Sequence, residues 1–78
     1  MSIEVKYFGM IEELVGKSSE ILDKEMFLNS NSSNKDVLIQ LYPQLELISF
    51  QLAVDRSLNL HVKENSKEMA LLPPFAGG

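Results

Sequence analysis

The residues with the clearest chemical potential stand at the end of the sequence, where residues 73–78 read PPFAGG. The final pair, Gly77 and Gly78, forms a thread almost without side-chain bulk that ends in an α-carboxylate. Glycine lacks Cβ and enters backbone conformations closed to other residues, so such a thread can pass through a narrow channel into another protein. We therefore expect the reactive group to be the carboxylate of Gly78, used at a site outside this chain.

Two prolines set the direction in which this thread leaves the domain. Proline fixes φ and has no N–H, so Pro73 and Pro74 end the short apolar strand expected over residues 68–72. Six extended residues at about 3.3–3.6 Å each span roughly 20 Å, enough to reach a catalytic centre buried in a partner. The sequence predicts a folded domain over residues 1–72 and a projecting, flexible reactive tail over residues 73–78.

The composition indicates one small globular domain. The 78 residues are 45% hydrophobic and 23% charged, with a net charge of −4. This negative balance argues against a nucleic-acid partner, since phosphate binding needs a basic surface. No run of about 18 apolar residues occurs, and the first residues show no basic leader, so we expect no membrane span, no signal peptide and a cytoplasmic location.

The absence of cysteine excludes a disulfide framework and a cysteine-based metal site. Any sulfur that the protein carries must therefore be attached elsewhere, and the terminal carboxylate is the unusual position that remains. His61 is the only histidine and has no clustered second ligand, so we expect no metal site and no bound cofactor. Glu12 and Glu13 diverge by about 100° on a helix and are expected to face solvent rather than work as paired carboxylates.

Hydrophobic periodicity predicts the elements that position the tail. Apolar residues alternate with polar ones over residues 3–7, 50–54 and 58–62, the period of half-buried strands. Between Gly9 and Gly16, apolar residues at i, i+3 and i+4 predict a short helix that Gly16 ends. For residues 19–28 we expect a strand running into a turn.

The main helix is expected between a polar loop over residues 29–34 and Pro43. Ser33 and Asp36 stand three apart before an apolar run, the arrangement of a capping box with aspartate in place of glutamate. Pro43 is expected to end the helix near Tyr42. One main helix and one short helix on a mixed sheet of about five strands predict an α+β fold, a ubiquitin-like β-grasp roll.

The sequence resembles the family of molybdopterin synthase sulfur-carrier (small) subunits from about residue 3 to residue 78. Residues 7–16 match its aromatic strand and following helix, which ends in Glu-Leu-x-Gly, and residues 71–78 match its apolar strand, Pro-Pro, apolar pair and Gly-Gly. Residues 53–58 resemble its middle segment, where asparagine is commoner than Asp55. Glu12 departs from the family's usual arginine, and residues 66–69 replace a Gly-Asp-Glu-Val turn, so both departures bear on the choice of partner.

The resemblance implies a sulfur carrier that has no catalytic activity on its own. A ubiquitin-activating-like adenylyltransferase would use ATP and Mg²⁺ to adenylate Gly78, and sulfur from a persulfide donor would convert the adenylate to a thiocarboxylate. Within a heterotetramer of two small and two large subunits, the thiocarboxylate would attack the cyclic pterin precursor of the molybdenum cofactor. The large subunit would supply the catalytic pocket, because this chain offers no convincing acid–base set.

Two groups of residues are expected to touch the large subunit. The residues that thread into it with Gly78 are Pro73, Pro74, Phe75, Ala76 and Gly77. The apolar residues that dock on it are Phe8, Leu60, Leu72 and Phe75, because they flank the tail on the expected sheet face. Phe75 is the expected main anchor, since it follows the strand's exit and has no obvious core to join.

Three other functions remain open from the sequence. The first is a sulfur carrier for thiamine or for tRNA thiolation, against which the Pro-Pro-x-x-Gly-Gly spacing argues. The second is a ubiquitin-like modifier that forms isopeptide bonds to lysines through Gly78. The third is an interaction module with an inert tail. Thiocarboxylate and isopeptide products differ in mass and in target.

Overall fold

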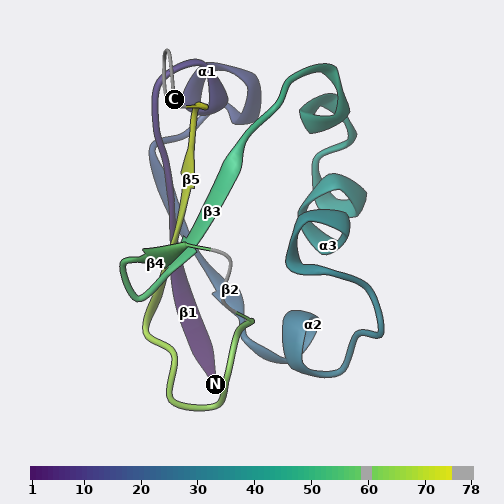
Figure 1. Cartoon of the computed structure of the whole chain (residues 1–78), viewed down its shortest axis with the longest axis vertical. Coiled ribbons are helices and arrows are strands. Elements are labelled where there is room, and N and C mark those ends of the chain that lie inside the picture. Colours follow the sequence, from purple (N-terminus) through teal and green to yellow (C-terminus); the bar gives the residue numbers. More distant parts are fainter. Residues whose placement is uncertain (59–60, 75–78) are drawn as a thin grey trace.

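The structure, a computed structural model, describes residues 1–58 and 61–74. Their helices and strands are β1 (Ser2–Tyr7), α1 (Met10–Val15), β2 (Ser19–Asp23), α2 (Glu25–Leu28), α3 (Asn34–Leu41), the 3-10 helix η1 (Pro43–Leu47), β3 (Gln51–Val54), β4 (Ser57–Leu58) and β5 (Glu68–Leu72). The strands form one mixed sheet with α2, α3 and η1 on one side of it, and α1 lies at the end where β1 and β5 finish (Figure 1).

The last strand in the sequence, β5, lies in the middle of the sheet, whose order is β2-β1-β5-β3-β4. It runs parallel to β1, with Val5 opposite Met69, and antiparallel to β3, with Leu52 opposite Leu71. The hairpin of β1 and β2 and the hairpin of β3 and β4 complete the two sides. This topology, with the first and last strands parallel and adjacent, confirms the expected α+β fold of the ubiquitin-like β-grasp type.

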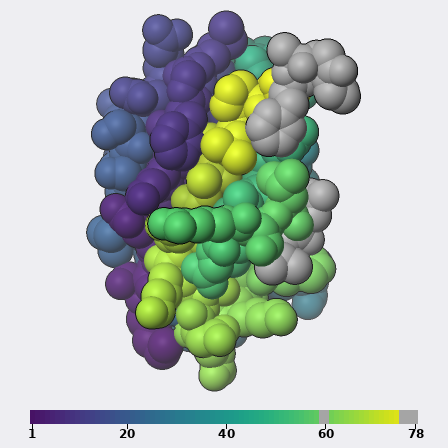
Figure 2. Space-filling model, turned by 60° about the vertical axis from the view of Figure 1, so that its left-hand side comes forward, coloured from purple at the N-terminus to yellow at the C-terminus, as the bar shows by residue number. Residues whose placement is uncertain are grey.

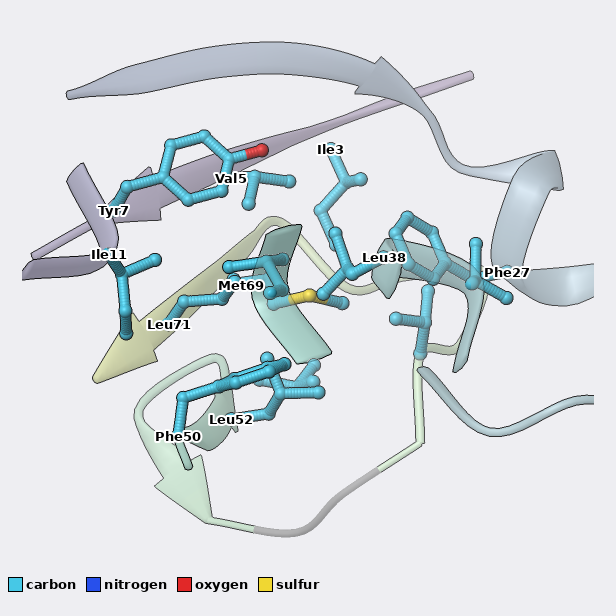
Figure 3. Packing of buried hydrophobic residues seen from close by; sticks show 14 of the residues in the cluster. Ile3, Val5, Tyr7, Ile11, Phe27, Leu38, Phe50, Leu52, Met69 and Leu71 are labelled. Atoms are coloured by element: carbon cyan, nitrogen blue, oxygen red, sulfur yellow. The ribbon is translucent and has the colours of Figure 1, made fainter. Parts of the chain in front are cut away.

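One apolar core lies between the sheet and the helices. The inward residues of β1 alternate as predicted, and Ile3, Val5 and Tyr7 are all buried. Figure 3 shows Met69 and Leu71 of β5 in the middle of this cluster, between side chains of β1 and β3. Because β5 is paired on both edges and buried on its inner face, its last residues have a fixed position in the fold.

The predicted cap of the main helix is present. Ser33 has extended backbone angles at the N-cap, and its Oγ accepts a hydrogen bond of 3.2 Å from the backbone N–H of Asp36. The helix ends at Leu41, close to the predicted position. Pro43 then begins η1, which the sequence reasoning missed; its fixed φ suits a first helical position, and Leu45 of this turn is fully buried.

The prediction that residues after β2 form only a turn was wrong, because they form the helix α2. Phe27 on this helix is buried in the core, and the preceding Lys24 is only 4% exposed. The Nζ atom of Lys24 donates a hydrogen bond of 2.7 Å to the carbonyl oxygen of Glu64, 40 residues away. These contacts between distant segments decide the local conformation, and they leave no clear periodic signal in the sequence.

The strand predicted over residues 58–62 was too long. Of that stretch, the described residues place only Leu58 in a strand, with Ser57 before it; residues 59–60 lie outside the described ranges, and Val62 is buried but belongs to no strand. The backbone N–H of Lys63 donates to Oγ of Ser66, and the N–H of Ser66 donates to the carbonyl of Lys63. This segment therefore satisfies its hydrogen bonds in a local turn instead of a strand ladder.

The turn between β3 and β4 ties this hairpin to the start of β5. Asp55 and Arg56 both have positive φ, 49° and 71°, as a two-residue hairpin loop of type I′ requires. The Oδ1 atom of Asp55 accepts backbone N–H bonds from Lys67 at 2.9 Å and Glu68 at 3.1 Å. These two bonds to its charged form hold the pKa of Asp55 below its usual range.

We expect Asp55→Asn to reduce the loss of stability in acid. The pKa of Asp55 in the folded state is lower than its value of about 3.9 in the unfolded chain. Ionised Asp55 therefore stabilises the fold above about pH 3.9, and this contribution is lost as the pH falls through the folded-state pKa. Asparagine keeps the acceptor oxygen and tolerates positive φ, but it does not titrate. Urea unfolding of both proteins between about pH 5 and pH 2 measures the difference; parallel declines would contradict the role assigned to Asp55.

Candidate functional site

The tail begins at the end of the central strand. β5 ends at Leu72, and Pro73 and Pro74 follow as exposed residues outside the sheet, as predicted. Without an N–H group, neither proline can extend the ladder between β1 and β3. The end of β5 lies beside α1 and at the opposite end of the molecule from the N-terminus (Figure 1). The predicted tail residues Phe75, Ala76, Gly77 and Gly78 lie outside the described residues, and so does Leu60.

The outer face of the sheet carries an apolar patch next to this exit. Leu72 and Ala70 point to this face, because side chains alternate along a strand and their neighbours Leu71 and Met69 point into the core. Phe8 directly follows β1, and its N–H donates a hydrogen bond of 3.3 Å to the carbonyl of Leu71. Figure 2 shows β5, in yellow, on this face between β1 and the hairpin of β3 and β4.

We call this surface the sheet patch and define it by four residues: Phe8, Leu58, Ala70 and Leu72. Phe8 is 43% exposed and Leu72 partly buried. Of the four residues predicted to dock on a partner, the structure thus places Phe8 directly after β1 and Leu72 at the end of the adjacent strand β5. The sequence reasoning missed Ala70 and Leu58; the sheet register connects them, because Ala53 lies opposite both.

A band of charges limits the sheet patch on the side away from the exit. Lys6 Nζ lies 3.3 Å from Oε2 of Glu68, and Arg56 Nε lies 3.6 Å from Oε1 of the same carboxylate. Pairs with this degree of exposure contribute at most about 1 kcal/mol to stability. Their main consequence is that the apolar surface is confined to the tail end of the sheet face.

A groove of about 420 Å³ lies on another side of the exit, lined by Met10, Ile11, Ile48, Ser49, Pro73 and Pro74. Gly9, which precedes α1, lies close to Pro73 in the lining of this groove. A Cβ at position 9 would lie 3.6 Å from Cγ of Pro73, which is an ordinary contact distance. The backbone angles of Gly9, φ 58° and ψ −134°, are however accessible essentially to glycine alone. Gly9 is therefore required for the chain direction between β1 and α1.

A polar cluster links β1, β2 and the end of α3. The hydroxyls of Tyr7 and Tyr42 donate hydrogen bonds of 2.5 and 2.6 Å to Oε2 of Glu20, and Lys17 Nζ lies 3.4 Å from Oε1. Burial acts to raise the pKa of Glu20, but the hydrogen bonds from Tyr42, Tyr7 and Lys17 together outweigh it and lower the pKa. Burial and the Glu20 carboxylate both raise the pKa of Tyr7. A protonated phenol bound to a carboxylate is no nucleophile, so this cluster stabilises the sheet edge.

Other candidate chemistry can be assessed for the described residues. Within residues 1–58 and 61–74, no group of three His, Cys, Asp or Glu side chains is arranged to hold a metal ion. Over the same ranges, no helix is long and apolar enough to cross a membrane. Glu12 and Glu13 both face solvent, as predicted from their spacing on the helix. His61 is exposed and lies outside the strand that was predicted to contain it.

Comparison with known proteins identifies the fold. No family model and no curated protein matches the chain. Among solved structures, the chain is similar to the crystal structure of SAMP1 from Haloferax volcanii, with a TM-score of 0.65 and 19% identity over 100% of both chains. Together with the strand order, this full-length similarity shows that the chain has the ubiquitin-like β-grasp fold.

We expect Gly9→Ala to destabilise the protein by about 1–3 kcal/mol, because an L-residue is strained at these backbone angles even where its Cβ has room. Gly16→Asn is the matched control at the other end of α1. Gly16 has φ 89° and ψ 13°, near the left-handed region that asparagine tolerates, and a Cβ there meets no atom within 4 Å. Urea unfolding measures both variants, and equal losses would contradict the requirement for glycine at position 9.

Proposed function

We propose that this protein is a ubiquitin-like sulfur carrier of molybdenum cofactor biosynthesis. The carboxylate of Gly78 is adenylated and converted to a thiocarboxylate, which donates sulfur to the cyclic pterin precursor inside molybdopterin synthase. The observation that carries this proposal is the position of the Gly77-Gly78 pair, reached from the central strand β5 through Pro73 and Pro74. A β-grasp domain alone is compatible with many functions, and it is the sequence that follows β5 that favours the role of a sulfur carrier.

The chemistry needs activation because a carboxylate has no good leaving group. Attack of a Gly78 carboxylate oxygen on the α-phosphate of ATP releases pyrophosphate and forms an acyl adenylate. A persulfide sulfur then attacks the carbonyl carbon and AMP leaves, and attack of a thiol on the acyl disulfide frees the thiocarboxylate and leaves a disulfide. An adenylyltransferase similar to ubiquitin-activating enzymes supplies the ATP and Mg²⁺ site, and a separate protein donates the persulfide.

The exit geometry supports delivery of the tail into a partner. β5 is fixed by pairing on both edges and by burial of Met69 and Leu71, so the first proline starts from a rigid base. In the proposed complex the domain keeps its fold, so the entropic cost of insertion is limited to the short segment that follows β5. In this proposal the large synthase subunit supplies the acid–base groups, and the two subunits assemble as a cytoplasmic heterotetramer of two copies each.

The alternatives use the same carboxylate with other acceptors. A carrier for thiamine or tRNA thiolation forms the same thiocarboxylate, whereas a protein modifier forms isopeptide bonds to lysines. The Pro-Pro spacing before the glycine pair favours the synthase role, because it matches the pattern of that family of small subunits. Intact-mass analysis of protein from its native cytosol separates thiocarboxylate from conjugates, and reconstitution with each acceptor separates the two kinds of carrier.

We expect deletion of Gly78 to abolish sulfur transfer and to leave thermal stability unchanged, because Gly78 follows the end of the last strand, at Leu72, by six residues in the sequence. The assay contains the activating enzyme, ATP, a persulfide donor, the synthase large subunit and the cyclic precursor, and measures dithiolene formation. Purified thiocarboxylated wild-type protein, added to the same reaction, is the positive control. Dithiolene formation supported by the deleted protein would refute the carrier role.

The sheet patch is expected to contribute binding energy to the complex with the large subunit. Phe8→Ser should weaken binding by more than about 1 kcal/mol, as the loss of an aromatic anchor does, and Phe75→Ser should do the same. Leu47→Ser is the control, because Leu47 is 79% exposed on η1 and lies outside the patch. Calorimetric titration of the purified subunits measures the affinities. An unchanged value for Phe8→Ser would exclude the sheet patch as a docking surface, and an unchanged value for Phe75→Ser would exclude Phe75 as an anchor.

A further inference from the structure

The groove beside the tail exit is an apolar surface that the sheet patch does not explain. Met10 and Ile11 of α1 form one wall, and Ile48 and Ser49, which precede β3, line another. Pro73 and Pro74 complete the lining, so the first two residues of the tail are also part of the groove. A protein that encloses the tail therefore contacts this groove at the same time.

The groove is large enough to accept an apolar side chain of a partner, and its lining is mostly apolar. Its volume of about 420 Å³ lies in the lower part of the range of about 300–1,000 Å³ found for ligand pockets. Among the described residues, Ser49 supplies the one polar side chain of the lining. Met10 is 60% exposed at its edge although Ile11 beside it is fully buried, so an apolar surface is open to solvent here.

The two short helices next to the groove, α1 and η1, carry exposed carboxylates. Glu13 stands three residues after Met10 and thus on the same side of α1, and Glu46 on η1 precedes Ile48 by two residues; both carboxylates are exposed. The two short helices are held together by Nε2 of Gln44, which donates a hydrogen bond of 3.0 Å to the carbonyl of Leu14. Neither residues 8–16 nor residues 42–50 contain lysine or arginine.

We propose that this groove binds a partner segment that presents one apolar side chain flanked by lysine or arginine. The apolar lining selects the central side chain, and the carboxylates of Glu13 and Glu46 select the basic flanks. This inference rests on the proposed function, because it assigns the groove to a protein that receives the tail.

The test is a titration of the isotope-labelled full chain with short peptides, followed by backbone amide chemical shifts. The probe is a peptide with one phenylalanine between two pairs of lysines. Two comparison peptides replace the lysines by glutamates or the phenylalanine by serine. We expect shifts at Met10, Ile11, Ile48 and Ser49 with the probe, and much weaker shifts with either comparison peptide.

Variants then test the two parts of the site. The double variant Glu13→Gln and Glu46→Gln should weaken binding of the probe about threefold at low salt. The control is Glu64→Gln, which removes an exposed carboxylate in the turn before β5. Met10→Ala should weaken binding, whereas Leu47→Ala, which truncates a more exposed apolar residue outside the groove, should not. Absence of shifts at the groove, or equal affinity for the acidic peptide, would overturn the inference.

The outcome is separable from that of the proposed function. The peptide titration does not involve Gly78, so the Gly78-deleted protein should bind the probe like the full chain. If the probe does not bind but the full chain still transfers sulfur, the groove inference alone is wrong. If the probe binds at the groove and sulfur transfer fails, the carrier chemistry is wrong and the basic-segment site stands.

Discussion

The pairing of β5 on both of its edges is the constraint on which the rest of the structure depends. A parallel neighbour requires a crossover connection, so the chain between β1 and β5 must travel around one side of the sheet and return. The helices of that connection supply the cover for Met69 and Leu71, which are fully buried. The exit of the tail is therefore positioned by the whole fold, and the strand before Pro73 cannot move without disturbing the core.

The same arrangement explains why apolar surface gathers around the exit. A domain of this length buries only about 60% of the surface of its unfolded chain, so some apolar side chains must remain outside. Phe8 and Met10 flank the turn between β1 and α1, beside the end of β5, and both are exposed. Ile21 and Leu47 are also exposed, but neither lines the sheet patch or the groove, and single exposed apolar residues are ordinary.

The parts of the fold that could be predicted are those where local and long-range signals agree. β1 alternates strictly, Ser33 caps α3 through its own side chain, and Gly16 ends α1 in a left-handed conformation, so each is visible in a short stretch of sequence. The helix α2 and the turn η1 escaped prediction because Lys24 and Leu45 owe their positions to distant segments. The prediction for the extent of β4 failed for a related reason, since Val62 is buried in the core but belongs to no strand and comes just before the turn between Lys63 and Ser66.

The candidate site likewise has a part that could be predicted from the sequence and a part that could not. Phe8 and Leu72 could be chosen from the sequence, because a β-grasp topology places the ends of β1 and β5 side by side. The groove could not be chosen, because Ile48 and Pro73 meet only through the packing of segments far apart in the chain.

The charges around the exit differ from one side to the other, and this difference has a consequence for recognition. The sheet patch borders a band in which Lys6 and Arg56 share the carboxylate of Glu68, whereas the short helices beside the groove carry glutamates without lysine or arginine. A narrow peptide segment with little side-chain bulk cannot by itself fix how the domain is rotated about the axis of that segment when a partner binds it. In the proposed complexes, apolar contacts on two sides would add affinity, and an asymmetric set of charges would fix the orientation, because a wrong rotation brings like charges together. The base of the tail can therefore fix the orientation in which a partner receives it.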